Sequence, residues 1–78
     1  MRVFIATFEH RHGSDVRVFR REESAEAWGI ALAAEYWGES MVGVDRPADP
    51  ADAAAAYWER MSEIGEEWFS VVAQEVEE

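Results

Sequence analysis

The side chains best suited to chemistry gather in one stretch, FEHRHGSDVRVFRREES, at residues 8–24. His10 and His12 lie two residues apart, with Glu9 and Asp15 nearby. Residues two apart in a strand point the same way, so two imidazoles could share a metal ion with a carboxylate. The chain has no cysteine and no third histidine to complete such a site. We therefore expect no metal here and interpret the stretch as the turn of a β-hairpin with solvated imidazoles.

Catalytic chemistry is not favoured by the other reactive residues. The chain has neither cysteine nor lysine, and Ser14 lies within four residues of both histidines, in the same turn. This spacing is too short for a nucleophile, a base and an orienting acid. The five glycines are scattered and form no phosphate-binding loop. We expect no catalytic residue, no cofactor and no enzymatic activity.

The elements around this stretch predict a β-hairpin. Residues 2–9 alternate as a strand, with Phe4, Ala6 and Phe8 on one side and Val3, Ile5 and Thr7 on the other. Residues 11–15 supply a turn, and residues 16–21 form a second strand. Because both sides of the first strand are largely apolar, we expect it in the centre of the sheet.

Two helices and a third strand follow the hairpin. Residues 23–37 are apolar on nearly opposite sides, which indicates a helix covered by the sheet on one side and by the second helix or another subunit on the other. Gly38 is expected to end it. Residues 49–67 indicate a second helix, with Asp49 as its N-cap, Pro50 as its first residue and Gly65 near its end. Period-two alternation returns over residues 68–76. The predicted fold class is α+β, one domain of residues 1–78 with order ββααβ and both helices on one face of a three-stranded antiparallel sheet.

Charge is distributed unevenly along the 78 residues. The net charge of −10 divides into +3 over residues 1–21 and −13 over residues 22–78. Such an excess of acid repels nucleic acid and anionic membranes and favours a basic partner. The alternative is that the acidity serves solubility alone. The N-terminal residues resemble no signal peptide and no apolar run reaches the ~20 residues of a membrane span, so we expect a cytoplasmic protein.

One acidic stripe is predicted on the second helix. Its members fall within about 60° on a helical wheel, opposite the apolar side, and we expect consecutive acids ~4–6 Å apart along the axis. That spacing roughly imitates the phosphates of a nucleic-acid strand. The alternative is an ordinary solvated helix surface. The candidate partner-binding residues are Asp52, Glu59, Glu63, Glu66 and the adjacent Glu67.

The hairpin arginines have two interpretations. They could pair with the acidic helices and hold the two halves of the chain together, or they could form a recognition edge. Internal pairing is the stronger expectation, because fifteen acids lie in the rest of the chain.

Three segments, FIATFEHRHGSDVRVF, ADPADAAAAYWERM and EEWFSVVAQEVE, together resemble a group of small acidic proteins encoded by phages and mobile elements. Some members of that group are anti-CRISPR proteins, which block the DNA-binding surface of a CRISPR effector. The resemblance implies an inhibitor that binds a basic nucleic-acid-binding protein, itself binding neither nucleic acid nor membrane. The alternative function is a structural or adaptor protein, a homodimer formed through the first helix, in which the acidity only aids solubility.

Overall fold

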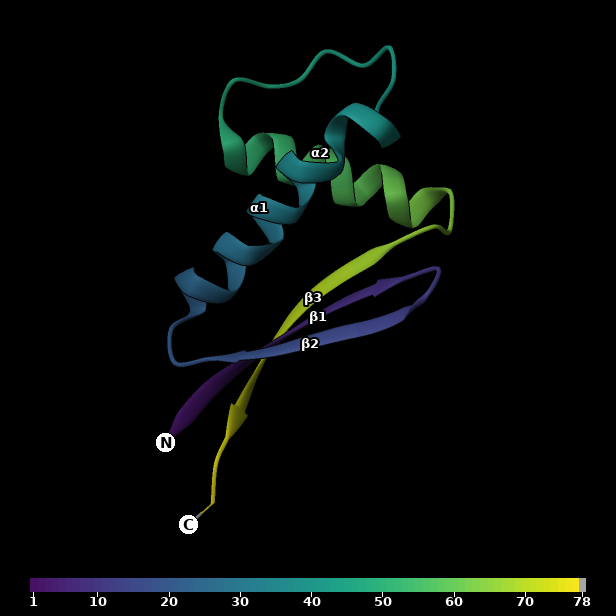
Figure 1. Ribbon diagram of the computed structural model, residues 1–78. Coiled ribbons are helices and arrows are strands. Elements are labelled where there is room, and N and C mark those ends of the chain that lie inside the picture. Colours follow the sequence, from purple (N-terminus) through teal and green to yellow (C-terminus); the bar gives the residue numbers. More distant parts are fainter. Residues whose placement is uncertain (78) are drawn as a thin grey trace.

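The chain forms one three-stranded sheet with both helices on the same side, which confirms the predicted fold class (Figure 1). The computed structural model describes residues 1–77. The strands lie in the order β2-β1-β3, and β1 pairs antiparallel with both neighbours, so the first strand is central as predicted. The elements are β1 (Arg2–His10), β2 (Gly13–Phe19), α1 (Glu22–Ser40), α2 (Pro50–Glu63) and β3 (Trp68–Glu75).

The hairpin loop is shorter than the sequence pattern predicts. Only Arg11 and His12 connect the strands, because His10 already pairs with Gly13. Ser14 and Asp15, expected in the turn, are ladder residues of β2. Gly13 has a φ of +132°, a conformation that residues with a side chain rarely adopt, so it can begin β2 directly after a tight loop.

Helix α1 continues past Gly38 to Ser40, so the expected stop at Gly38 is wrong. Trp37 and the capping residue Met41 lie four residues apart, and both are buried in the core beside α2. Continuing the helix places both side chains on one side, and their burial outweighs the cost of about 1 kcal/mol for a glycine in a helix. The Met41 N–H closes the last turn by donating to the Trp37 carbonyl at 2.8 Å.

Helix α2 begins as predicted. The Asp49 carboxylate accepts hydrogen bonds from the N–H groups of Ala51 at 2.8 Å and Asp52 at 3.2 Å, and Pro50 occupies the first turn. These contacts satisfy N–H groups that a helix start leaves without partners.

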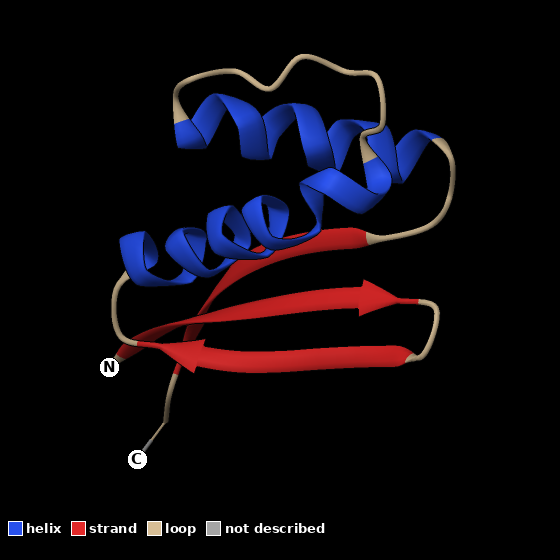
Figure 2. Cartoon of the chain, turned by 45° about the horizontal axis from the view of Figure 1, so that its top comes forward, coloured by secondary structure: helices blue, strands red, loops and turns tan. Residues whose placement is uncertain are grey.

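Helix α1 lies on the sheet (Figure 2), and α2 packs mainly on α1, reaching the sheet at β3 and, through the contact of Trp58 with Phe8, at β1. The expectation that α1 is covered by the sheet and by the second helix is therefore confirmed. Trp58 of α2 spans the layers: its ring stacks on Phe69 at 5.4 Å, and its Nε1 donates to the Gly29 carbonyl at 3.2 Å. Within residues 1–77, neither helix has the length and apolar character needed to cross a membrane.

Candidate partner-binding surface

Three of the predicted acids form a stripe on α2. Asp52, Glu59 and Glu63 are exposed, and the register set by the Asp49 cap turns them away from the buried side of the helix, on which Tyr57 lies. Among residues 1–77, none of the three forms an ion pair. The expected spacing of ~4–6 Å is wrong for the first interval. Glu59 lies seven positions after Asp52, a rise of ~10 Å along the helix axis, whereas Glu63 lies ~6 Å beyond Glu59.

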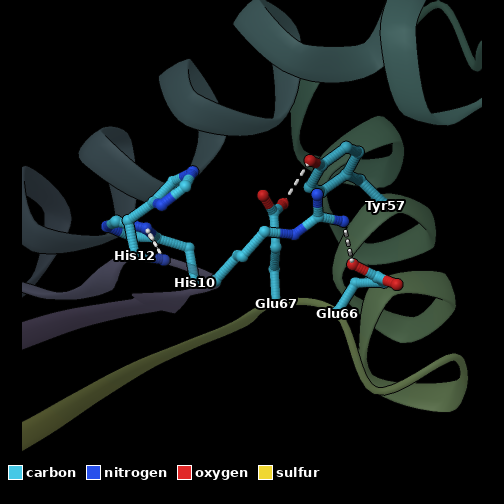
Figure 3. A network of polar contacts seen from close by, with 6 residues as sticks. His10, His12, Tyr57, Glu66 and Glu67 are labelled. Atoms are coloured by element: carbon cyan, nitrogen blue, oxygen red, sulfur yellow. Dashed lines mark hydrogen bonds and ion pairs between the residues drawn. The ribbon is translucent and has the colours of Figure 1, made fainter.

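Glu66 and Glu67 do not continue this stripe, because α2 ends at Glu63. Gly65 takes a φ of +71° and donates to the Ser62 carbonyl at 3.2 Å, while the Glu66 N–H donates to the Met61 carbonyl at 3.0 Å. This paired arrangement is a Schellman motif, which closes the helix and redirects the chain. The two glutamates therefore lie in the connection to β3 and approach the tip of the hairpin (Figure 3).

Both glutamates have partners within the fold. Nη2 of Arg11 donates to Oε2 of Glu66 at 3.3 Å, which joins the hairpin loop to the turn after α2. The Tyr57 hydroxyl donates to Oε1 of Glu67 at 2.5 Å (Figure 3). Burial, followed by the hydrogen bond to Glu67, raises the pKa of Tyr57 well above its ordinary value, so the phenol keeps its proton. Glu67 is thus half-buried and holds the start of β3 against α2.

The histidines lie at the end of the hairpin, as predicted, and contact one another through the backbone. The His12 N–H donates to Nδ1 of His10 at 3.2 Å, so the proton of the neutral His10 ring lies on Nε2. Nε2 in turn lies 3.1 Å from Oδ2 of Asp15. Both nitrogens of His10 therefore have partners. In residues 1–77, no group of three or more histidine, cysteine, aspartate or glutamate side chains is arranged to hold a metal ion. The expectation of no metal stays a prediction.

A cavity of about 560 Å³ opens between the hairpin tip, the C-terminal half of α1 and the turn after α2. Phe8 and Tyr36 contribute aromatic rings, 6.3 Å apart between centroids. Four carboxylates line it against one arginine, Arg11, which is already paired with Glu66. A cationic group is therefore the ligand that this lining suits best. The four carboxylates are Asp15, Glu39, Glu66 and Glu67.

The arginines leave most of the acidic surface uncompensated. Arg17 of the hairpin lies over the Trp28 ring, 4.6 Å from its centroid, rather than against a carboxylate. Within residues 1–77, the contact of Arg11 with Glu66 is the one ion pair between the hairpin and the chain after it, apart from that of Arg2 with Glu75 in the sheet. Internal pairing of the hairpin arginines is thus confirmed in part: Arg2 and Arg11 pair with acids later in the chain, but neither acid lies on a helix.

Sequence reasoning missed the aromatic part of this surface. Tyr36 comes from α1, far from the hairpin in the chain, and the linear sequence contains no signal that brings it near the histidines. The chain was compared with protein families, with curated proteins and with solved structures, and no match was found in any of the three comparisons.

Proposed function

We propose that the protein is a small acidic inhibitor that docks on the basic, nucleic-acid-binding surface of a partner protein and so excludes nucleic acid from it. The observation that carries the proposal is the stripe of Asp52, Glu59 and Glu63, which is exposed and has no ion pair within residues 1–77. Like charges along one side of a helix cost a few tenths of a kcal/mol each. A basic partner would offset that cost and would be drawn in by the net charge of −10.

The acid-lined cavity supports the same proposal. It lies beyond the C-terminal end of the stripe, where Glu66 and Glu67 follow Glu63 after one turn. A guanidinium group from the partner would find carboxylates and the Tyr36 ring there, an environment that suits arginine. The stripe would then orient the partner, and the cavity would hold one of its basic side chains.

A CRISPR effector is one partner of this kind, in agreement with the resemblance to anti-CRISPR proteins noted above, and it would place the action of the protein in the cytoplasm. The proposal assigns binding and no catalysis. Nucleic acid competes with the protein for the partner and does not bind the protein itself, because both are strongly acidic.

The test uses two triple variants with the same change in charge. The stripe variant carries Asp52→Arg, Glu59→Arg and Glu63→Arg, and the control variant carries Glu26→Arg, Glu35→Arg and Asp45→Arg at exposed acids elsewhere. Each reversal changes the charge by two units, so both variants differ from the original by +6. Both should keep the fold in circular dichroism, since all six positions are exposed.

The immobilised protein is used to capture its partner from a lysate of the cells in which the protein acts, and added duplex DNA should release that partner. The stripe variant should lose capture while the control retains it, and raising the salt concentration should weaken capture steeply. If the captured protein binds no nucleic acid, or if both variants capture it equally, the proposal is wrong.

A further inference from the structure

The side of the sheet opposite the helices is apolar and uncovered. Both helices lie on one side of the sheet (Figure 2), and the strand alternation directs every second side chain to the other side. Val16, Val18 and Val72 on that side are 58%, 62% and 57% exposed. We call the centre of this uncovered side the open face. Its six residues are neighbours in the ladder: Ile5 and Thr7 from β1, Val16 and Val18 from β2, and Ser70 and Val72 from β3.

The composition of the open face differs from that of a solvated sheet surface. An antiparallel sheet that meets water on one side normally alternates apolar residues inward with polar residues outward. Here the outward positions are aliphatic or hydroxyl-bearing, and the open face contains no ionisable side chain, although charged residues make up 31% of the chain. Charge returns only beyond its two ends. Glu9 lies at one end, and Arg20, the first residue after β2, lies at the other by continued alternation.

We propose that the open face is the interface of a homodimer. A basic partner would gain nothing from an uncharged surface, whereas a second copy can cover it without bringing the acidic helices together, because both helices lie on the far side of the sheet. An apolar strand surface also suits face-to-face packing of two sheets about 10 Å apart.

The positions of the two end charges select the arrangement of the copies. A two-fold axis along the strands would place both Glu9 side chains at one end of the interface and both Arg20 side chains at the other, so that like charges share each end. An axis in the plane of the interface and perpendicular to the strands reverses the strand direction instead. This arrangement places Val16 against Val18 of the second copy and Ser14 against Arg20 of the second copy. Because Glu9 is the ladder partner of Ser14, Glu9 then lies near Arg20 of the second copy. Charge complementarity favours this second arrangement.

The available area is close to what a dimer requires. Measured from the row of Glu9 to the row of Arg20, so that both ends of the open face are included, three strands ~4.8 Å apart with about seven residues each, rising ~3.3 Å, cover a rectangle of ~14 by ~23 Å. Pleated side chains raise its accessible surface to about 500 Å², so two copies would bury about 1,000 Å², near the lower limit for a specific interface. Trp68, 44% exposed at the Glu9 end, adds the kind of aromatic side chain that often anchors interfaces. The dimer is therefore expected to dissociate on dilution.

The test is sedimentation velocity of the full chain over a concentration series, which requires no knowledge of another partner. The original protein should shift from the mass of one chain to the mass of two as its concentration rises. Val18→Glu places two carboxylates in the apolar contact and should weaken association about tenfold or more. Ala31→Glu, on the exposed side of α1, makes the same change in charge and should have no effect. Circular dichroism checks that both variants fold.

A charge exchange tests the arrangement. Glu9→Arg and Arg20→Glu should each weaken the dimer several-fold, and the double variant should restore it, because the pair is reformed with its signs reversed. A protein that stays monomeric at every concentration would overturn the proposal, as would a Val18→Glu variant that associates like the original. Failure of the double variant to restore association would overturn the perpendicular two-fold arrangement.

Discussion

Replacing Gly29 with alanine should destabilise the protein, although the same exchange usually stabilises a helix. A Cβ atom at Gly29 would lie 2.4 Å from Cε2 and 2.7 Å from Cδ2 of Phe69. Carbon atoms in contact are ordinarily ~3.5–4.0 Å apart, so the ring would have to withdraw by about 1 Å. The Phe69 ring stacks on Trp58 at 5.4 Å and meets Trp28 edge-on at 5.7 Å, so its withdrawal disturbs two further aromatic contacts.

The change in unfolding free energy caused by Gly29→Ala is the sum of three contributions. Overpacking costs ~1–3 kcal/mol, and weakening the aromatic pairs costs about 0.5–1.5 kcal/mol more. Alanine returns ~1 kcal/mol through its higher helix propensity. The net loss of unfolding free energy is therefore about 0.5–3.5 kcal/mol, and for a domain of this size each kcal/mol lowers the melting temperature by ~4–8 °C. Thermal unfolding followed by circular dichroism measures this shift.

Gly38 provides the matched control within the same helix. It lies in α1, its φ is not positive, and a Cβ atom there would meet nothing within 4 Å. Gly38→Ala should therefore raise the stability by ~0.5–1 kcal/mol. In a Phe69→Leu background, Gly29→Ala should cost less than in the original protein, because the clashing ring is absent. If Gly29→Ala raises the melting temperature as Gly38→Ala does, the packing of Phe69 on α1 is incorrect.

Four further predictions concern single residues. The pKa of Tyr57 in the folded protein is raised above its unfolded value of ~10, so the contribution of Tyr57 to stability is complete below pH ~10 and is lost as the pH rises further. In urea titrations at several pH values, Tyr57→Phe should show a smaller loss of stability at alkaline pH. Gly65→Ala should cost ~1 kcal/mol in chemical denaturation, because alanine is strained at a φ of +71° although the space around it is open. Asp49→Ala should cost ~1 kcal/mol in the same assay, since two N–H groups of α2 lose their acceptor, whereas Asp49→Asn should cost less. Zinc titrated by calorimetry at neutral pH should show no stoichiometric site; micromolar binding that is lost in His12→Ala would contradict this.

The order and pairing of the elements could be predicted because the apolar periodicity is strong. The alternation around Phe4 and Ile5 correctly identified a central strand, and the Asp49-Pro50 pair correctly marked the start of a helix. The C-terminal end of α1 was predicted wrongly because the local preference of Gly38 was given more weight than the burial of Met41, which depends on α2. Local rules cannot weigh a contact with an element that comes later in the chain.

The candidate site was less predictable for the same reason. Four of the five acids were identified from one helical wheel and Glu67 was added as their neighbour, but the helix ends before Glu66. Gly65 was the available signal, since glycine commonly follows a helix cap and turns the chain. The cavity could not be foreseen at all, because β1, the hairpin loop, α1 and the turn after α2 each contribute part of its lining.

The central position of β1 has a consequence for the synthesis of the chain. β1 is made before the other described elements and its neighbour β3 after them, and the ladder pairs Arg2 with Glu75. The hairpin and the helices have contacts close in sequence and can form while the ribosome is still at work, but one edge of β1 stays unpaired until the final strand emerges. The sheet is therefore expected to be completed only after β3 has been made, and a nascent chain stalled before residue 68 should expose both that edge and the Trp58 ring to protease and to chaperones.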